Sequence, residues 1–256
     1  MDYGICHLNA IPIRKDPSHE SEMTSQLLFG EVFQVIVTEG DWIKIHMNFD
    51  FYEGWIKSNQ YLSIEEEKHQ KILEETPHYS NDMFSFIQGK DNTLQILSLG
   101  AGLPGYENGR FHLSEQEFEF DGQVISGKKN KSNLVKTAYR FLNTPHLWGG
   151  RTPLGIDCSG FTQMVYRING HQLLRDAHQQ ASQGEVLSFI EECEPGDLAF
   201  FDNEEGEILH CGLLLADNHI MHCYEKVRID RIDQSGIYNV DTKRHTHRLR
   251  VMKHIF

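Results

Sequence analysis

The chain has 256 residues, of which 39% are hydrophobic and 24% are charged, as in an ordinary globular protein. A formal net charge of −13 disfavours nucleic acid and anionic membranes as partners. No apolar run approaches the roughly 18 residues of a membrane-spanning helix, and the first residues lack the basic and apolar regions of a signal peptide. We therefore expect no membrane span and no nucleic-acid partner.

The five cysteines are an odd number at irregular spacing, which argues against a disulfide framework. A reducing compartment is the simpler interpretation. Together with the missing leader, this favours a cytoplasmic location. The cysteines are Cys6, Cys158, Cys193, Cys211 and Cys223.

Residues 1–64 have the pattern of a small all-β domain. Residues 31–37 are rich in β-branched and aromatic side chains, and residues 42–47 alternate apolar and polar side chains. A Gly-Asp turn separates these two predicted strands, and a third strand begins at Gly54. Short strands with such turns predict a barrel of about 60 residues.

The middle of the chain is less regular. Residues 65–76 form a charged run, which predicts a solvated linker or short helix. Residues 77–127 contain strand candidates at 94–99 and 118–120, and we expect a second, degenerate β-barrel there. The glycine-rich residues 100–105 resemble a dinucleotide-binding loop in spelling, but no amphipathic helix follows them, so we expect a plain turn and no cofactor.

From residue 130 onward the pattern changes to mixed α and β. Ser132 is a candidate N-cap for a helix with apolar residues from Leu134 to Leu142. Residues 175–181 predict a short helix, and residues 198–201 predict a strand after a Pro-Gly-Asp turn.

One cysteine in this region lies in a distinctive turn, Asp-Cys-Ser-Gly-Phe at residues 157–161. Apolar residues at helical spacing follow it, with Asp157 as a candidate N-cap and Gly170 as a candidate stop. Cys158 is therefore expected in the first turn of a buried helix, where unpaired backbone N–H groups lower the pKa of a thiol. Such a cysteine is a candidate nucleophile, and a nucleophilic thiol needs a base.

Two histidines could supply that base. The Asp-Asn turn at residues 217–218 predicts an antiparallel hairpin between strands at 208–216 and 219–223. His210 and His222 then lie near each other on adjacent strands and can share a face. One histidine can take the thiol proton while the second orients the first, which is the arrangement that cysteine nucleophiles require.

The chain has 15 histidines, so His210 alone could equally be a structural residue. His210 with Cys211 and His222 with Cys223 could also form a metal site. Neighbours on a strand point to opposite faces, so four convergent ligands are disfavoured and we expect no metal. The other cysteines are most simply small apolar side chains of the core.

The ordered motifs resemble the NlpC family of cell-wall cysteine peptidases over residues 130–256, and bacterial SH3 domains over residues 1–64. The resemblance implies an α+β architecture, with small SH3-like β-barrels followed by a compact papain-like catalytic domain. The motifs are Ser-Glu-Met at 21–23, Gly-Asp-Trp at 40–42, Tyr-Glu-Gly-Trp-Ile at 52–56, Pro-His-Leu-Trp-Gly-Gly at 145–150, Asp-Cys-Ser-Gly-Phe at 157–161, Pro-Gly-Asp-Leu at 195–198, and His210 with His222.

The resemblance also implies a reaction, namely hydrolysis of the bond from D-glutamate (through its γ-carboxyl) to an L-diamino acid in murein peptides. Cys158 would be the nucleophile, His210 the general base and His222 the orienting residue, with no metal or cofactor. The murein peptide would be the partner, and the positions implied to line its site are Trp148, Asp157, Ser159, Arg175 and Asp176.

The chain resembles the subgroup of the family that hydrolyses this γ-D-glutamyl-L-diamino-acid bond. In that subgroup, an acid and a tyrosine of the first SH3 domain help select peptides with a free N-terminal L-alanine. The matching positions are Glu22 and Tyr52, and a carboxylate and a phenol suit an ammonium group. Tyr52 could equally pack in the core. Some relatives carry a serine where Ala177 stands, so substrate affinity or selectivity could differ here.

Two other functions stay open at this point. A binding module would hold wall peptides without turnover, and its Cys158 would alkylate no faster than an ordinary thiol. A different thiol amidase or acyltransferase on the same fold would be separated by a substrate panel. The sequence leaves open the preferred diamino acid (meso-diaminopimelate or lysine), the oligomeric state and the role of residues 77–127.

Overall fold

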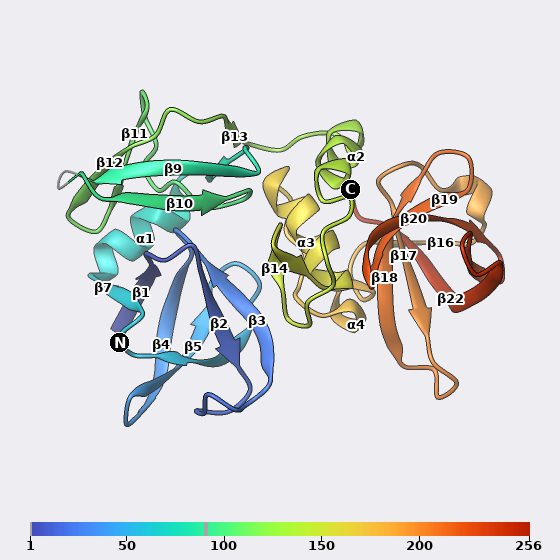
Figure 1. The fold of residues 1–256 in the computed structure, drawn as a ribbon, viewed down its shortest axis with the longest axis horizontal. Helices are drawn as coiled ribbons and strands as arrows, with labels where there is room; N and C mark the ends of the chain where they lie inside the picture. The colour runs from blue at the N-terminus through green and yellow to red at the C-terminus, as the bar shows by residue number, and fades with distance from the viewer. Residues whose placement is uncertain (1, 90–91) are drawn as a thin grey trace. The chain divides into compact units, whose positions relative to one another are not determined.

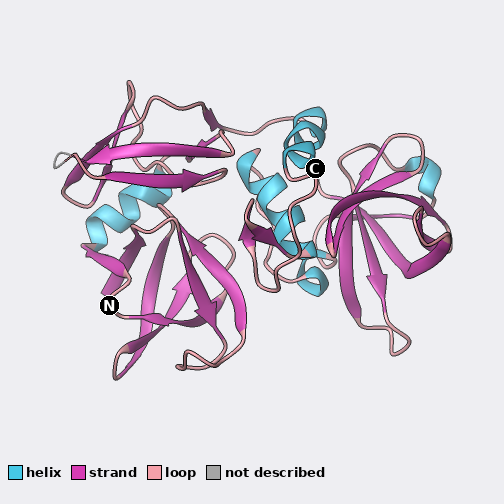
Figure 2. Cartoon of the chain, viewed as in Figure 1, coloured by secondary structure: helices cyan, strands magenta, loops and turns pink. Residues whose placement is uncertain are grey.

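The computed structural model describes residues 2–89 and 92–256. The chain forms two compact units (Figure 1). Unit 1 contains Met1–Lys128 and the short segment Trp148–Pro153, and unit 2 contains Lys129–Leu147 and Leu154–Phe256. Strands predominate over helices in the chain, as Figure 2 shows, which agrees with the expected α+β class.

Unit 1 begins with the predicted small β-barrel. Its seven strands form one sheet in the order β3-β2-β6-β5-β4-β1-β7. The predicted strands at 31–37 and 42–47 are confirmed as β4 and β5, and the third begins one residue earlier than expected. The strands are β1 (Asp2–Cys6), β2 (Ala10–Arg14), β3 (Met23–Leu28), β4 (Val32–Glu39), β5 (Trp42–Met47), β6 (Glu53–Lys57) and β7 (Tyr61–Ile64).

Alternation along β5 shows why these residues form a barrel. Ile43, Ile45 and Met47 are buried in its core, while the residues between them are partly exposed. Gly40 has φ of +57° at the turn between β4 and β5, a conformation that glycine adopts without steric cost. The period of two therefore places one apolar face inward, as the sequence predicts.

The second half of unit 1 follows a helix, α1 (Glu66–Glu74), in the charged run where a linker or short helix is expected. Four strands pair in the order β10-β9-β12-β11, and β13 pairs with β8. These elements are β8 (His78–Ser80), β9 (Phe84–Gly89), β10 (Leu94–Ser98), β11 (Arg110–Leu113), β12 (Gln116–Glu119) and β13 (Val124–Ser126).

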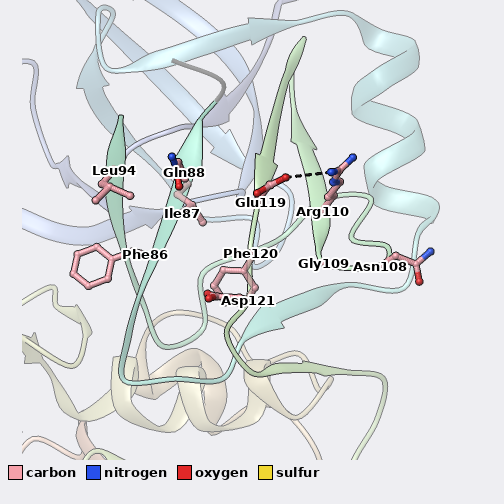
Figure 3. Close-up of a pocket in the computed structure, with 10 residues that line it drawn as sticks. All are labelled: Phe86, Ile87, Gln88, Leu94, Asn108, Gly109, Arg110, Glu119, Phe120 and Asp121. Atoms are coloured by element: carbon pink, nitrogen blue, oxygen red, sulfur yellow. Dashed lines mark hydrogen bonds and ion pairs between the residues drawn. The ribbon is translucent and has the colours of Figure 1, made fainter. Parts of the chain in front are cut away.

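A hollow of about 470 Å³ lies on this second group of strands (Figure 3). Exposed Phe86 and Leu94 border it, together with an ion pair between Arg110 and Glu119. None of the residues that line it belongs to the cysteine and histidine motifs. The predicted chemistry therefore has to be sought in unit 2.

The segment Trp148–Pro153 is held in unit 1 by buried polar contacts. Arg151 donates to both carboxylate oxygens of Glu31 at 2.9 and 3.0 Å, and both side chains are buried. Its guanidinium also donates to the Gln26 carbonyl at 2.6 Å. Gly149 has φ of +75°, and a Cβ there would lie 2.5 Å from the Met23 carbonyl oxygen, so this close approach requires glycine. The segment includes β14 (Arg151–Thr152).

Unit 2 combines helices with a closed sheet. Its strands run in the order β16-β22-β17-β18-β19-β20-β21, and the additional pairing of β21 with β22 closes six of them into a ring. The elements are α2 (Lys131–Arg140), β15 (Gly155–Ile156), α3 (Cys158–Ile168), α4 (Ala177–Gln180), β16 (Glu185–Leu187), a 3₁₀ turn (Ile190–Glu192), β17 (Leu198–Asp202), β18 (Ile208–Leu215), β19 (His219–Tyr224), β20 (Lys226–Asp233), β21 (Gly236–Asn239) and β22 (Arg244–His254).

The predicted helix near residue 132 exists, but its predicted cap is wrong. Asn130 is the N-cap of α2, and its side-chain oxygen accepts from the Asn133 backbone N–H. Ser132 instead donates its hydroxyl hydrogen to the same oxygen at 2.8 Å. Both residue types cap helices well, so composition alone does not decide between them.

Helix α3 packs against β18 and β19, and this packing brings the cysteine turn to the histidine hairpin. The apolar residues Phe161, Met164 and Val165 of α3 are fully buried. Within the described residues, no helix is both long enough and apolar enough to cross a lipid bilayer.

Candidate active site

Cys158 is the first residue of α3, as the sequence predicts. The Asp157 carboxylate caps the helix by accepting from the Gly160 backbone N–H at 2.6 Å. Helix α3 ends at Ile168, and Gly170 follows with φ of +79°. The thiol therefore lies where the first-turn N–H groups have no partner within the helix and favour negative charge.

The two predicted histidines meet across the hairpin of β18 and β19. The pairing register places His222 directly opposite Gly212, so His210 is the diagonal neighbour of His222. The two rings are joined by a hydrogen bond of 2.9 Å between His210 Nε2 and His222 Nδ1. A Cβ at position 212 would lie 2.9 Å from the His222 Cβ, so glycine provides the space for this ring.

A carboxylate extends this chain of contacts. His222 Nε2 lies 3.0 Å from Asp230 Oδ2, and Asp230 is fully buried on β20. Arg228 donates to both oxygens of Asp230 at 2.7 and 3.0 Å, and the Val240 backbone N–H donates at 3.0 Å. Although burial acts to raise its pKa, the hydrogen bonds from these groups lower the pKa of Asp230 to about 2.

These partners determine which ring nitrogens carry hydrogen. Ionised Asp230 can only accept, so His222 Nε2 carries the hydrogen. Burial lowers the pKa of His222, so its ring is neutral and Nδ1 accepts from His210 Nε2–H. Burial lowers the pKa of His210 to about 4, against the opposing effect of the Cys158 thiolate. His210 Nδ1 is thus left unprotonated to take a proton from the Cys158 thiol, whose pKa His210 helps to lower.

The Cys158 thiol has a pKa well below its ordinary value. A hydrogen bond from Cys211 is the largest cause, burial opposes it, and the charge and hydrogen bond of His210 add to the lowering. Burial raises the pKa of Cys193 to about 11, and it also raises the pKa values of Cys6, Cys211 and Cys223. Cys158 is the reactive thiol at neutral pH because only the thiolate is nucleophilic.

A third histidine lies beside this pair. The ring of His247 on β22 stacks on that of His210, with centroids 4.2 Å apart and an angle of 25° between the ring planes. Nitrogens of His210, His222 and His247 lie within 4.8 Å of one another, which raises the question of a metal ion. Both nitrogens of His222 are already hydrogen-bonded, and stacked rings direct their in-plane lone pairs in parallel. The cluster therefore fits proton transfer better than metal coordination.

The predicted substrate-lining residues beside Cys158 form one buried network. Arg175 donates to both oxygens of Asp157, at 2.6 and 3.1 Å, and to the Ser159 hydroxyl at 2.9 Å. Asp176 is the N-cap residue of α4, and Ala177 is the buried first residue of that helix. The network holds the capping carboxylate of α3 and thus the start of the helix that carries the thiol.

The remaining predicted residues belong to unit 1. Trp148 is exposed, and its indole N–H donates to the Glu22 carboxylate at 2.7 Å. Tyr52 is half-buried and packs against the apolar core of the first barrel. Core packing of Tyr52 was one of the two interpretations left open by the sequence.

Sequence reasoning missed Asp230 and His247. Asp230 lies eight residues after His222 on the neighbouring strand, and its meeting with His222 depends on the β19–β20 register. His247 lies in a polar stretch at the end of the chain, beside two other histidines of the same strand. Predicting a third strand after residue 223 would have pointed to Asp230.

The comparisons with known proteins agree with this geometry. Residues 143–247 match the NlpC/P60 family, and residues 13–60 match the bacterial dipeptidyl-peptidase SH3 domain. The γ-D-glutamyl-L-lysine dipeptidyl-peptidase of Bacillus subtilis is 30% identical over 79% of this chain and 73% of that protein. The chain belongs to the NlpC/P60 family. It is accordingly an NlpC/P60 cysteine peptidase.

Two further relatives cover nearly the whole chain. Dipeptidyl-peptidase 6 of Lysinibacillus sphaericus is 26% identical over 88% of this chain and 90% of that protein. The crystal structure of an NlpC/P60 family protein from Bacillus cereus superposes with a TM-score of 0.85 over 99% of both chains, at 18% identity. The second match supports the fold: SH3-like β domains followed by an α+β catalytic domain.

Proposed function

We propose that this peptidase hydrolyses the bond from the γ-carboxyl of D-glutamate to an L-diamino acid in murein peptides with a free N-terminal L-alanine. The observation that carries the proposal is the hydrogen-bonded chain from His210 through His222 to Asp230, next to the Cys158 thiol whose pKa His210 helps to lower. The substrate class is supported by the names of the two relatives, a γ-D-glutamyl-L-lysine dipeptidyl-peptidase and dipeptidyl-peptidase 6.

In the proposed reaction the thiolate of Cys158 attacks the γ-carbonyl carbon, and His210 Nδ1 holds the thiol proton. The carbonyl oxygen becomes negative, and the Cys158 backbone N–H at the start of α3 is placed to stabilise it; one such donor contributes about 10²–10³ in rate. His210 then gives its proton to the leaving amine. A water molecule, deprotonated by His210, hydrolyses the thioester and restores the thiol.

The main test is turnover of L-Ala-γ-D-Glu-L-Lys and of the meso-diaminopimelate analogue. We expect release of the diamino acid by the wild type and its complete loss in Cys158→Ala. The matched control is Cys193→Ala, because the Cys193 thiol contacts the Phe189 carbonyl and Met252 Sδ and its raised pKa keeps it a thiol. Unchanged turnover in Cys158→Ala would refute the thiol mechanism. Turnover of ester or lipid-amide substrates in place of both peptides would identify a different amidase or acyltransferase.

Selection of a free N-terminal amine is the finer part of the proposal. Glu22 offers a carboxylate and Tyr52 a phenol, and an α-ammonium group prefers both. We expect the N-acetylated peptide to be cut more slowly than the free peptide, and Glu22→Gln to narrow that difference. Equal rates for both peptides with the wild type would remove Glu22 and Tyr52 from the recognition of substrate.

We also propose that the protein works in the cytoplasm, on imported wall peptides. The support is its five unpaired cysteines, which suit a reducing compartment. Fractionation of cells that produce the full chain tests this, and recovery outside the cytoplasmic fraction would contradict it.

A further inference from the structure

Besides Phe201, whose ring is tilted against His210 at 5.8 Å, two neighbours orient the general base, and the hydrogen bond to His222 supplies only one of them. That bond fixes the direction of His210 Nε2, and the rings of His210 and His222 are nearly perpendicular, at 86°. This single hydrogen bond still leaves the His210 ring some freedom to rotate about its Cβ–Cγ bond. The second neighbour is His247, whose ring lies against the face of His210 at 4.2 Å.

We propose that His247 is a positioning residue of the active site. Its ring holds the plane of His210 so that Nδ1 points at the Cys158 thiol, and its aromatic face stabilises the imidazolium that forms when His210 takes the proton. A cation over an aromatic face is attracted by the negative face of the ring, and more strongly where water is excluded. This inference deepens the proposed function, and it depends on the thiol–imidazole chemistry rather than on the substrate.

His247 is held in place by its own contacts. Its Nδ1 lies 2.8 Å from the Thr246 hydroxyl, and the rings of Phe201 and Tyr224 pack edge-on against it at 6.1 and 5.1 Å. Burial lowers its pKa to about 4. The ring is therefore neutral at pH 7, and only when His247 is itself protonated does its charge act to lower the pKa of His210.

A bulge in β22 places the His247 side chain next to His210. Along β21 and β22, Ile237 pairs with His247 but Tyr238 pairs with His245, so Thr246 is an extra residue that bulges out of the strand. His245 is consequently exposed while His247 is half-buried. Gly236 allows the close approach, because a Cβ there would lie 1.8 Å from the His247 carbonyl oxygen.

The other titratable groups around His210 do not hold the plane of its ring. Cys158 on α3 gives its proton to His210, His222 on β19 holds the other nitrogen, and Asp230 on β20 acts through His222. Tyr224 contacts His247 rather than His210. Of these groups, His247 is the one whose ring lies flat on the base.

The experiment compares His247→Phe, which keeps an aromatic face, with His247→Leu, which fills the space without one. The readouts are the rate of alkylation of Cys158 by iodoacetamide, followed by mass spectrometry, and kcat and KM separately. We expect His247→Leu to slow alkylation at pH 7 and kcat roughly three- to tenfold, with KM nearly unchanged. His247→Phe should restore most of both rates. The matched control is His245→Leu on the same strand, which should match the wild type.

A third variant separates positioning from structural support. In His247→Ala, water reaches His210 and the burial that lowers its pKa is relieved, so we expect its titration to rise from about 4 toward its ordinary value. NMR follows this change, with the His210 signal assigned by its loss in His210→Ala. Wild-type alkylation rates in His247→Leu, or equal slowing in the Phe and Leu variants, would overturn the proposal. Because alkylation needs no peptide, these outcomes are independent of whether the proposed substrate is correct.

Discussion

The two units each bury a carboxylate against an arginine, and one of these pairs also contacts a histidine of the proposed active site. In unit 1, Glu31 accepts from Arg151 and from the Leu28 backbone N–H. In unit 2, Asp230 accepts from Arg228 and a backbone N–H, and in addition from the ring of His222. The local geometry is nearly the same, and the difference lies in the third partner.

That third partner decides what the buried charge does. The charge of Glu31 holds Arg151 in place. With it, Glu31 holds the segment Trp148–Pro153, which precedes the Cys158 turn in the sequence. The charge of Asp230 fixes the hydrogen on His222 and, one ring further, the free nitrogen of His210. A buried ion pair is therefore structural or catalytic according to whether a titratable ring completes its hydrogen bonds.

The largest effect is expected from Glu31→Gln, because it leaves Arg151 buried without a counter-charge. Breaking a buried pair in this way typically costs about 3–5 kcal/mol of unfolding free energy. Denaturant unfolding should show this loss, while kcat of the folded variant stays near wild type. In a matched variant, Glu31→Met with Arg151→Met removes both charges and should recover much of the stability. A folded Glu31→Gln protein with kcat reduced as strongly as by loss of Asp230 would erase the contrast between the two pairs.

Asp230→Asn should act mainly on kcat rather than on the free energy of unfolding. The amide can donate to His222 Nε2, which would turn the hydrogen to Nδ1 and point it at the hydrogen of His210. We expect kcat to fall about 10²- to 10³-fold with little change in KM, because loss of the correct tautomer is costly even with the geometry intact. Steady-state kinetics on the L-Ala-γ-D-Glu peptides measure this. Asp241→Asn, which removes only the exposed partner of Arg228, is the control.

The contrast also shows what could be read from the sequence. The alternation in β5, the cap at Asp157 and the hairpin of His210 and His222 are local patterns, and each was predicted correctly. The cap of α2 was wrong because Asn130 and Ser132 are equally good caps two residues apart. Local pattern therefore placed Cys158 at a helix start and His210 beside His222 on a hairpin, as the structure has them.

The partners that complete each pair were not predictable in the same way. Glu31 and Arg151 are 120 residues apart in sequence, and nothing in either neighbourhood points to the other. Asp230 depends on the register of β19 with β20, and His247 depends on a one-residue bulge that reverses the alternation of β22. Register and bulges are set by the whole sheet, so sequence patterns within one strand do not reveal them.

The smallest effect is expected from Cys211→Ala, which changes the pKa of the thiol that gives up the proton. A hydrogen bond from Cys211 is the largest cause of the lowered pKa of Cys158, although the Cys211 thiol also donates to Gln180 Oε1 at 3.8 Å. In Cys211→Ala the donor is lost, so the pKa of Cys158 should rise and the thiolate fraction at a given lower pH should fall. The pH profile of iodoacetamide alkylation should shift to higher pH, with a few-fold slower reaction at pH 7. Cys223→Ala is the control, since its thiol donates to the Ile156 carbonyl instead. If the profile of Cys211→Ala were unshifted, the helix start and His210 would be the groups that lower the pKa of Cys158.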